Sequence, residues 1–171
     1  VTLGTWFIFE AANFIYSQNA TLRAQDVEAS APLLQFLGNT FRIGGAVFTY
    51  AVVAVVLLVA LFYYILNHTA WGRHVYALGD DPDAARLSGI STRRVLISVY
   101  AVAGLICGFA GWALIGRLGS VSPTSGYEAN IQSITAVVIG GTSLFGGRGS
   151  VIGTLIGALI VGVFAMGLRI W

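Results

Sequence analysis

The chain has 171 residues, of which 57% are hydrophobic and only 9% are charged. Soluble domains carry about 25% charged residues, so this composition, with a mean hydropathy of +0.83, excludes a soluble globular domain. The net charge of +2 comes from arginines scattered along the chain, and this dispersed charge gives no support to nucleic-acid binding. The single cysteine excludes a disulfide framework.

Long stretches without charge predict membrane spans. They cover residues 43–67, 95–116, 129–147 and 149–168, and each is long enough, or nearly so, to cross about 30 Å of hydrocarbon as a helix. Strands of a transmembrane barrel would alternate apolar and polar residues, whereas these runs are continuous. We therefore expect an all-α integral membrane protein, a polytopic helical bundle that contacts lipid and forms a single transmembrane domain over residues 1–171.

The first segment, residues 1–16, is apolar apart from Glu10 and Asn13, and it is short for a span. A mixed polar loop follows over 17–42, in which LLQFL predicts a short surface helix. The next helix is expected from about residue 43 to residue 66. The chain starts without Met and ends directly after an apolar helix, so we expect a piece of a longer protein.

The polar connection at 77–94, ALGDDPDAARLSGISTRR, predicts a short helix with both ends marked. Asp81 can cap it, Pro82 suits the first helical position, and Asp83 favours the positive end of the helix dipole. Gly89 supplies a left-handed stop. This segment is either an ordinary loop with a helical turn or a helix that meets a partner protein at the membrane surface.

Arginine counts predict which side of the membrane this connection faces. The loop before the second span holds two arginines, Arg23 and Arg42, whereas the 67–94 connection holds four near helix ends. Cytoplasmic loops are enriched in Lys and Arg, so the connection is expected on the cytoplasmic side. Its four arginines are Arg73, Arg86, Arg93 and Arg94.

Small residues predict close helix packing in two spans. The helix expected at 95–116 carries Gly104, Gly108 and Gly111, and the last helix carries glycines at four-residue spacing. Such faces let another helix backbone approach closely. The glycines of the last helix are Gly149, Gly153 and Gly157.

Residues 128–140 predict a half-length helix, about 20 Å long at 1.5 Å per residue. It breaks into GGTSLFGGRGS at 140–150 before the final helix. Irregular backbone at membrane depth is tolerated only where protein or a water-filled cavity covers it. The sequence therefore predicts a broken or re-entrant segment that can serve as a gate, through Gly140, Gly141, Gly146, Gly147 and Gly149.

Catalytic and metal-binding patterns find no support. The glycine-rich stretch lacks the Lys–Ser/Thr pair of a phosphate loop and follows no strand. His68 and His74 are six residues apart, so they do not share a helical face as a metal pair would. No nucleophile–base arrangement stands out, so we expect a protein that is not an enzyme and holds no cofactor.

Polar residues inside the apolar segments are candidates for a solute path. Glu10 and Asn13 lie three apart on one face of the first helix, and intramembrane ionisable residues favour a function. Glu128, Asn130 and Gln132 open the half-length helix and could hydrogen-bond a hydroxyl-rich solute. The alternatives are a hydrogen bond between helices for the first pair and interfacial capping for the second group.

Several long motifs resemble the permease subunit of bacterial ATP-binding cassette importers of the ribose and xylose type. They are VTLGTW, WGRHVYALGDDPDAARLSGIS, RLGSVSPTS and AVVIGGTSLFGGRGSVIGTLIGALIVGV, and together they cover essentially the whole chain. A more specific likeness to the permeases of fructose import systems is carried by NFIYS, LRAQD, FRIGGAVFTY and WALIGR.

The resemblance implies the permease fold of these importers in a bacterial inner membrane, working by alternating access. It implies a second permease copy, a periplasmic sugar-binding protein and cytoplasmic ATP-binding subunits that carry the ATP and Mg. In such importers a short cytoplasmic coupling helix fits a groove on the ATPase. The residues at that position here are Asp80, Asp81, Pro82, Asp83, Ala84, Ala85, Arg86, Leu87, Ser88 and Gly89.

Two other functions share parts of this pattern. Permeases for branched-chain amino acids have the same general architecture, and a passive solute channel would share the glycine-packed helices and the broken segment. A channel would not need a capped helix in its cytoplasmic loop. ATP dependence and a comparison of sugars with amino acids separate these alternatives.

Overall fold

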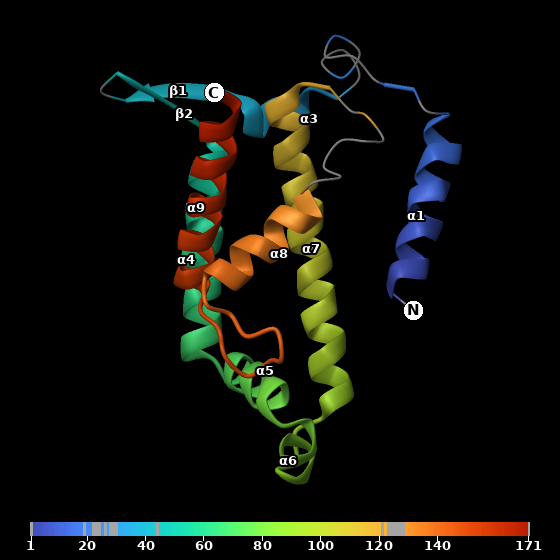
Figure 1. The fold of residues 1–171 in the computed structure, drawn as a ribbon, viewed down its shortest axis with the longest axis vertical. Helices are drawn as coiled ribbons and strands as arrows, with labels where there is room; N and C mark the ends of the chain where they lie inside the picture. The colour runs from blue at the N-terminus through green and yellow to red at the C-terminus, as the bar shows by residue number, and fades with distance from the viewer. Residues whose placement is uncertain are drawn as a thin grey trace. The chain divides into compact units, whose positions relative to one another are not determined.

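A computed structural model describes residues 2–18, 20–21, 25, 27, 31–43, 45–120, 122 and 129–170. Within these described ranges, three helices are long and apolar enough to span a membrane, namely α4 (Tyr50–His68), α7 (Thr92–Leu118) and α9 (Val151–Ile170). Figure 1 shows the order of the elements along the chain. The expected multi-pass helical membrane protein is confirmed, with one β-hairpin as an exception.

The chain forms two compact units. The first unit comprises Val1–Val52 and Gly108–Tyr127, and the second comprises Val53–Cys107 and Glu128–Trp171. α1 (Thr2–Ser17) lies in the first unit, at the position where the sequence predicts a short apolar helix.

The first unit contains the exception, a hairpin of β1 (Thr40–Ile43) and β2 (Ala46–Thr49). The strands pair antiparallel, with Ile43 opposite Ala46, and Gly45 at the turn has a φ of 90°. The prediction that a helix begins at residue 43 is therefore wrong, and α4 begins at Tyr50. A Gly-Gly pair between β-branched and aromatic residues favours a tight hairpin, and glycine is a poor helix former.

Aromatic rings connect this hairpin to its neighbours. The ring centroid of Tyr50 lies 5.4 Å from that of Phe36 and 5.3 Å from that of Phe41. Phe36 belongs to η1 (Phe36–Gly38), which follows α3 (Pro32–Gln35). The short helix predicted at LLQFL is thus confirmed, although Leu37 within it is buried.

The end of α7 packs against this short helical segment. The indole Nε1 of Trp112 donates a hydrogen bond to the carbonyl of Leu33 at 3.1 Å. A Cβ added to Gly116 would lie 2.7 Å from the backbone nitrogen of Gly38. The two backbones meet here because both residues are glycine.

In the second unit, α4 leads through a corner at Thr69 into α5 (Ala70–Asp80). The Thr69 hydroxyl donates to the carbonyl of Ile65 at 2.7 Å and accepts from the backbone N–H of Gly72 at 3.3 Å. Thr69 is therefore the N-cap of α5. α5 was not predicted from the sequence, because the start of the polar connection at 67–94 was expected to be a loop.

α6 (Pro82–Leu87) follows α5 after the single residue Asp81. A small apolar cluster joins α5, α6 and the first turn of α7 through Leu78, Ala85 and Val95. A hydrogen bond of 2.7 Å from the Trp71 indole to the Ser98 hydroxyl adds a second tie between α5 and α7. The three elements therefore form one packed corner.

The half-length helix α8 (Ala129–Ile139) packs against α9. A Cβ added to Gly157 would meet the carbonyl oxygen of Ala136, and one added to Gly140 would lie 2.5 Å from the carbonyl oxygen of Gly153. Close packing at Gly153 and Gly157 is thus confirmed. In Figure 1, α8 and α9 are joined by the loop 140–150, which runs down to α5.

The glycine face of α7 behaves differently. A Cβ added to Gly104, Gly108 or Gly111 would meet none of the described atoms within 4 Å. The close approach of another helix to this face therefore stays a prediction.

Candidate functional site

The candidate partner-binding site is α6 with its two caps. One carboxylate oxygen of Asp81 accepts from the backbone N–H groups of Asp83, at 2.9 Å, and Ala84, at 3.0 Å. Pro82 occupies the first turn, where its missing N–H costs nothing. The predicted N-terminal cap is confirmed.

The C-terminal stop is also confirmed. The N–H of Ile90 donates to the carbonyl of Ala85 at 3.1 Å, and the N–H of Gly89 donates to that of Arg86 at 3.0 Å. Gly89 has a φ of 84°, so the helix ends in a Schellman motif with glycine in the left-handed region. Ser88 adds a hydrogen bond from its hydroxyl to the carbonyl of Ala84.

α6 has two contrasting faces. Ala85 is 3% exposed and packs against Leu78 and Val95, whereas Leu87 is 90% exposed. Asp83 and Arg86 are also exposed. The apolar side chain of Leu87 therefore lies near charged side chains, on a helix that is capped at both ends. This exposed leucine makes α6 a candidate contact surface for another protein.

A shallow groove lies beside this outward face. It has a volume of about 410 Å³ and runs between α6 and the start of α7, lined in part by Asp83, Arg86 and Arg93. The lining carries both signs of charge, and ionic contacts at the rim of an interface favour specificity over affinity. A partner at this groove would meet side chains of both charges.

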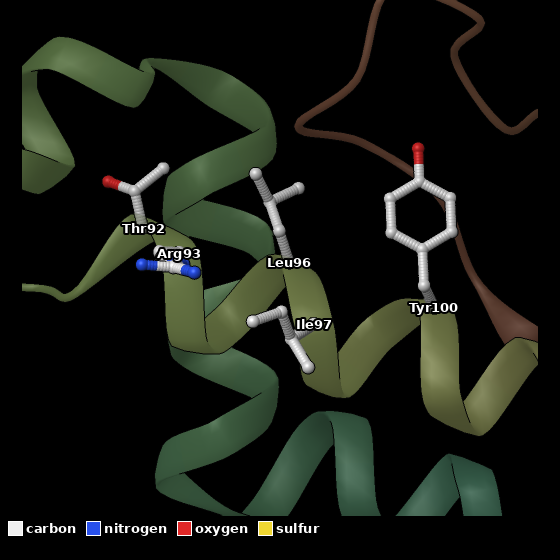
Figure 2. Close-up of a pocket in the computed structure, with 5 residues that line it drawn as sticks. All are labelled: Thr92, Arg93, Leu96, Ile97 and Tyr100. Carbon is white, nitrogen blue, oxygen red and sulfur yellow. The ribbon is translucent and has the colours of Figure 1, made fainter.

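A second groove, of about 670 Å³, lies along α7 itself. Figure 2 shows Thr92 and Arg93 at the polar end of the row, followed by the side chains of Leu96, Ile97 and Tyr100 along the helix. All five lining residues come from α7. This groove is therefore the surface of one face of a single helix, with no lining residue from a second element to close it.

The second candidate region is the loop that follows α8. The N–H of Thr142 donates to the carbonyl of Val137, and the N–H of Gly141 donates to that of Val138. With a φ of 79° at Gly141, these bonds form a Schellman motif that stops α8 after three turns. The predicted break in the helix is therefore confirmed and has a local cause.

The remaining glycines of this loop serve two purposes. Gly146 and Gly147 have φ values of 98° and 73°, which favour glycine. A Cβ on Gly149 would lie 2.7 Å from the side chain of Thr142, so this position allows a close approach. The N–H of Ser143 donates to the carbonyl of Arg148 at 2.9 Å and closes the loop on itself.

The predicted path residues lie on separate helices. Glu10, which is half-buried, and the exposed Asn13 are in α1, and the exposed Asn130 and Gln132 are in α8. α1 belongs to the first unit and α8 to the second. Asn130 and Gln132 are two residues apart and so do not share a helical face. Glu128 lies outside the described residues.

Among the described residues, no group of three or more His, Cys, Asp or Glu side chains is placed to hold a metal ion. The His68 ring lies tilted against the Tyr64 ring, with 5.2 Å between the ring centroids. Tyr64 precedes it by one helical turn on α4, so this contact is local.

Two elements, the hairpin and α5, were not predicted from the sequence. The hairpin had a signal in the Gly-Gly pair within FRIGGAVFT. α5 had a signal in Thr69, an N-cap residue followed by a helix-forming run that ends before Pro82. α5 matters because it carries α6 on its end.

Comparison with known protein families shows to which family this chain belongs. A family model described as "Branched-chain amino acid transport system / permease component" matches residues 1–170. The chain belongs to this permease family. No solved structure matches it.

Named relatives of this permease are sugar import permeases. The fructose import permease protein of Rhizobium meliloti is 68% identical over 170 residues, which cover 99% of this chain and 47% of the relative. The ribose import permease protein of Bacillus subtilis is 36% identical, with coverage of 99% and 51%. The ribose import permease protein of Escherichia coli K12 is 46% identical, with coverage of 70% and 36%. The chain thus spans about half the length of the first two relatives.

Proposed function

We propose that this chain forms part of the transmembrane permease of an ATP-driven importer in a bacterial inner membrane, and that its substrate is fructose or a related monosaccharide. The supporting observation is the 68% identity, over 99% of the chain, to a protein named as a fructose import permease. The branched-chain amino acid label belongs to the family description, whereas the relatives reported above are named for sugars. This difference favours a sugar over an amino acid.

In this proposal, the energy enters through α6. Asp80–Gly89 docks on a cytoplasmic ATP-binding subunit, which carries the ATP and Mg, and Leu87 is its apolar anchor. The complex also contains a second permease copy and a periplasmic sugar-binding protein. The permease itself needs no catalytic group, because closure of the ATPase pair favours one of the two conformations of the permease over the other.

The broken segment is the proposed gate. Half-length helices with irregular backbone line the substrate path in other transporters, and the loop 140–150 after α8 has that form. The path is assigned to the polar residues Glu10, Asn13, Glu128, Asn130 and Gln132, whose side chains can hydrogen-bond sugar hydroxyls.

The decisive experiment measures uptake by the full-length permease. It is reconstituted in proteoliposomes with its ATP-binding subunit and binding protein, and labelled fructose is compared with labelled leucine, with and without ATP. We expect fructose uptake that requires ATP. Uptake of leucine alone would support the amino-acid alternative, and uptake without ATP would support a passive channel.

A double variant tests the docking role of α6. Replacing Arg86 and Leu87 with Asp should abolish ATP-driven uptake while the permease still folds, since both side chains are exposed. Leu33→Asp serves as a matched control at another exposed leucine and should leave coupling intact. Normal uptake by the double variant would remove α6 from the ATPase interface.

Single variants test the path. We expect Glu10→Ala and Asn130→Ala to lower the uptake rate while the complex still assembles, because each removes a hydrogen-bonding side chain from the proposed route. Rates equal to wild type for both variants would exclude these residues from the path.

A further inference from the structure

The loop 140–150 meets the C-terminal end of α5 where glycine backbones from both segments approach each other closely. A Cβ added to Gly79 would lie 2.9 Å from the backbone nitrogen of Gly147, and one added to Gly146 would meet the carbonyl oxygen of Gly79. Distances under 3.0 Å cannot be kept by a real Cβ unless the backbone moves. Glycine is therefore required on both sides of this contact.

Polar groups reinforce the same contact. The Tyr76 hydroxyl donates a hydrogen bond to the carbonyl oxygen of Gly149 at 3.1 Å. A Cβ on Gly147 would lie 2.7 Å from the carboxylate of Asp80, so this carboxylate lies against the loop. Tyr76, Gly79 and Asp80 occupy the last two turns of α5, and all three face the loop.

The α5 side of the contact is continuous with α6. Asp80 is the last residue of α5, and the next residue, Asp81, caps α6. The cluster of Leu78, Ala85 and Val95 packs the two helices together. A displacement of α6 by a partner would therefore carry the end of α5 with it, since packed elements move as rigid bodies.

The loop side is equally well held to the helices that it joins. The Schellman motif at Gly141 ties the loop to α8, and the Ser150 hydroxyl accepts from the N–H of Gly153 at 2.9 Å at the start of α9. A cavity of about 340 Å³, lined in part by Leu66, Val75 and Thr154, borders the contact.

We propose that the contact of Gly79 and Asp80 with Gly146 and Gly147 transmits the motion of α6 to the broken segment. Tyr76, Gly79 and Gly147 are then positioning residues for transport, although none of them touches the sugar or the ATPase. The inference rests on the proposed function of α6 and the loop. It adds the physical route by which docking at one moves the other.

Gly79→Ala tests this route in the full complex. We expect the complex to assemble and hydrolyse ATP, while the number of sugar molecules imported per ATP falls by about fivefold or more, the low end of typical allosteric coupling. Gly162→Ala is the matched control, because a Cβ there meets no described atom within 4 Å. It should keep the wild-type ratio.

Tyr76→Phe provides a second, milder variant that removes one hydroxyl. It should lower the same ratio by about two- to tenfold, as expected for the loss of one hydrogen bond. A purely structural role would reduce assembly, hydrolysis and uptake together and leave the ratio unchanged. An unchanged ratio in both variants would overturn the proposal.

Hydrogen exchange separates this proposal from the proposed function. In the wild-type complex, adding ATP should change amide exchange within residues 140–150, and Gly79→Ala should abolish that change. A wild-type complex that imports no sugar would reject the proposed function alone. A wild-type exchange change that persists unaltered in Gly79→Ala would reject the transmission route alone.

Discussion

Two glycine-bearing helix faces have similar spacing and different surroundings. On α9, Gly153 and Gly157 lie against Gly140 and Ala136, with backbone atoms where a Cβ would stand. On α7, a Cβ at Gly108 would meet no described atom within 4 Å. Small residues at helical spacing permit a close approach, and a partner backbone must still be brought to the face. The chain does this for α9 because α8 folds back on it directly.

The largest effect is expected at the centre of the packed face. Gly157→Ala places a methyl group against the carbonyl of Ala136 and 2.8 Å from the backbone nitrogen of Gly140. Overpacking typically costs about 1–3 kcal/mol, so α8 should separate from α9. The thermal unfolding midpoint of the purified full-length permease should fall clearly. An unchanged midpoint would contradict the packed face.

A smaller loss is expected at Gly141, which stops α8 and holds it on that face. Gly141→Ala meets no described atom within 4 Å, but its φ of 79° is strained for an L-residue. A left-handed residue with a Cβ costs about 1–2 kcal/mol. Gly141→Asn is the control, because Asn tolerates this region better, and its unfolding midpoint should lie between those of Ala and wild type.

The cap of α9 should contribute less. Ser150→Ala removes the acceptor for the N–H of Gly153, and loss of an N-cap typically costs about 1 kcal/mol. Ser150→Asp restores an acceptor at this position and should recover most of the unfolding midpoint. Equal midpoints for the Ala and Asp variants would show that the cap has no role.

The open face should respond least. Gly108→Ala adds a methyl group where none of the described atoms is near, and alanine in a helix is favoured over glycine by about 0.5–1 kcal/mol. The midpoint should stay the same or rise slightly. A fall as large as that of Gly157→Ala would show that another segment packs on this face of α7, and it would remove the contrast between the two faces.

Local sequence was sufficient for α6 and for the break after α8. Asp81, Pro82 and Gly89 each act on backbone groups within four residues, so their roles follow from the sequence pattern. The Gly-Gly pair is also a local signal for the hairpin, but it lies within an apolar run that begins at residue 43 and that equally favours a helix. A continuous apolar run of this kind does not distinguish a strand from a helix.

The outward face of α6 was not predictable from its composition. Leu87 is exposed and Ala85 is buried, although leucine is the more hydrophobic of the two. The reason lies outside the helix, in Leu78 of α5 and Val95 of α7. A helix of six residues has too few positions for a periodic pattern to show which side is covered.

The sequence by itself determined the membrane class, the capped helix at Asp81–Gly89 and the broken segment, because apolar length, caps and left-handed glycines act over a few residues. The tertiary structure alone decided which glycines are in contact. Gly79 lies 68 positions before Gly147 in the sequence, and their backbones meet only because α5 and the loop after α8 are brought together. Close approach depends on partners distant in sequence, which no local pattern encodes.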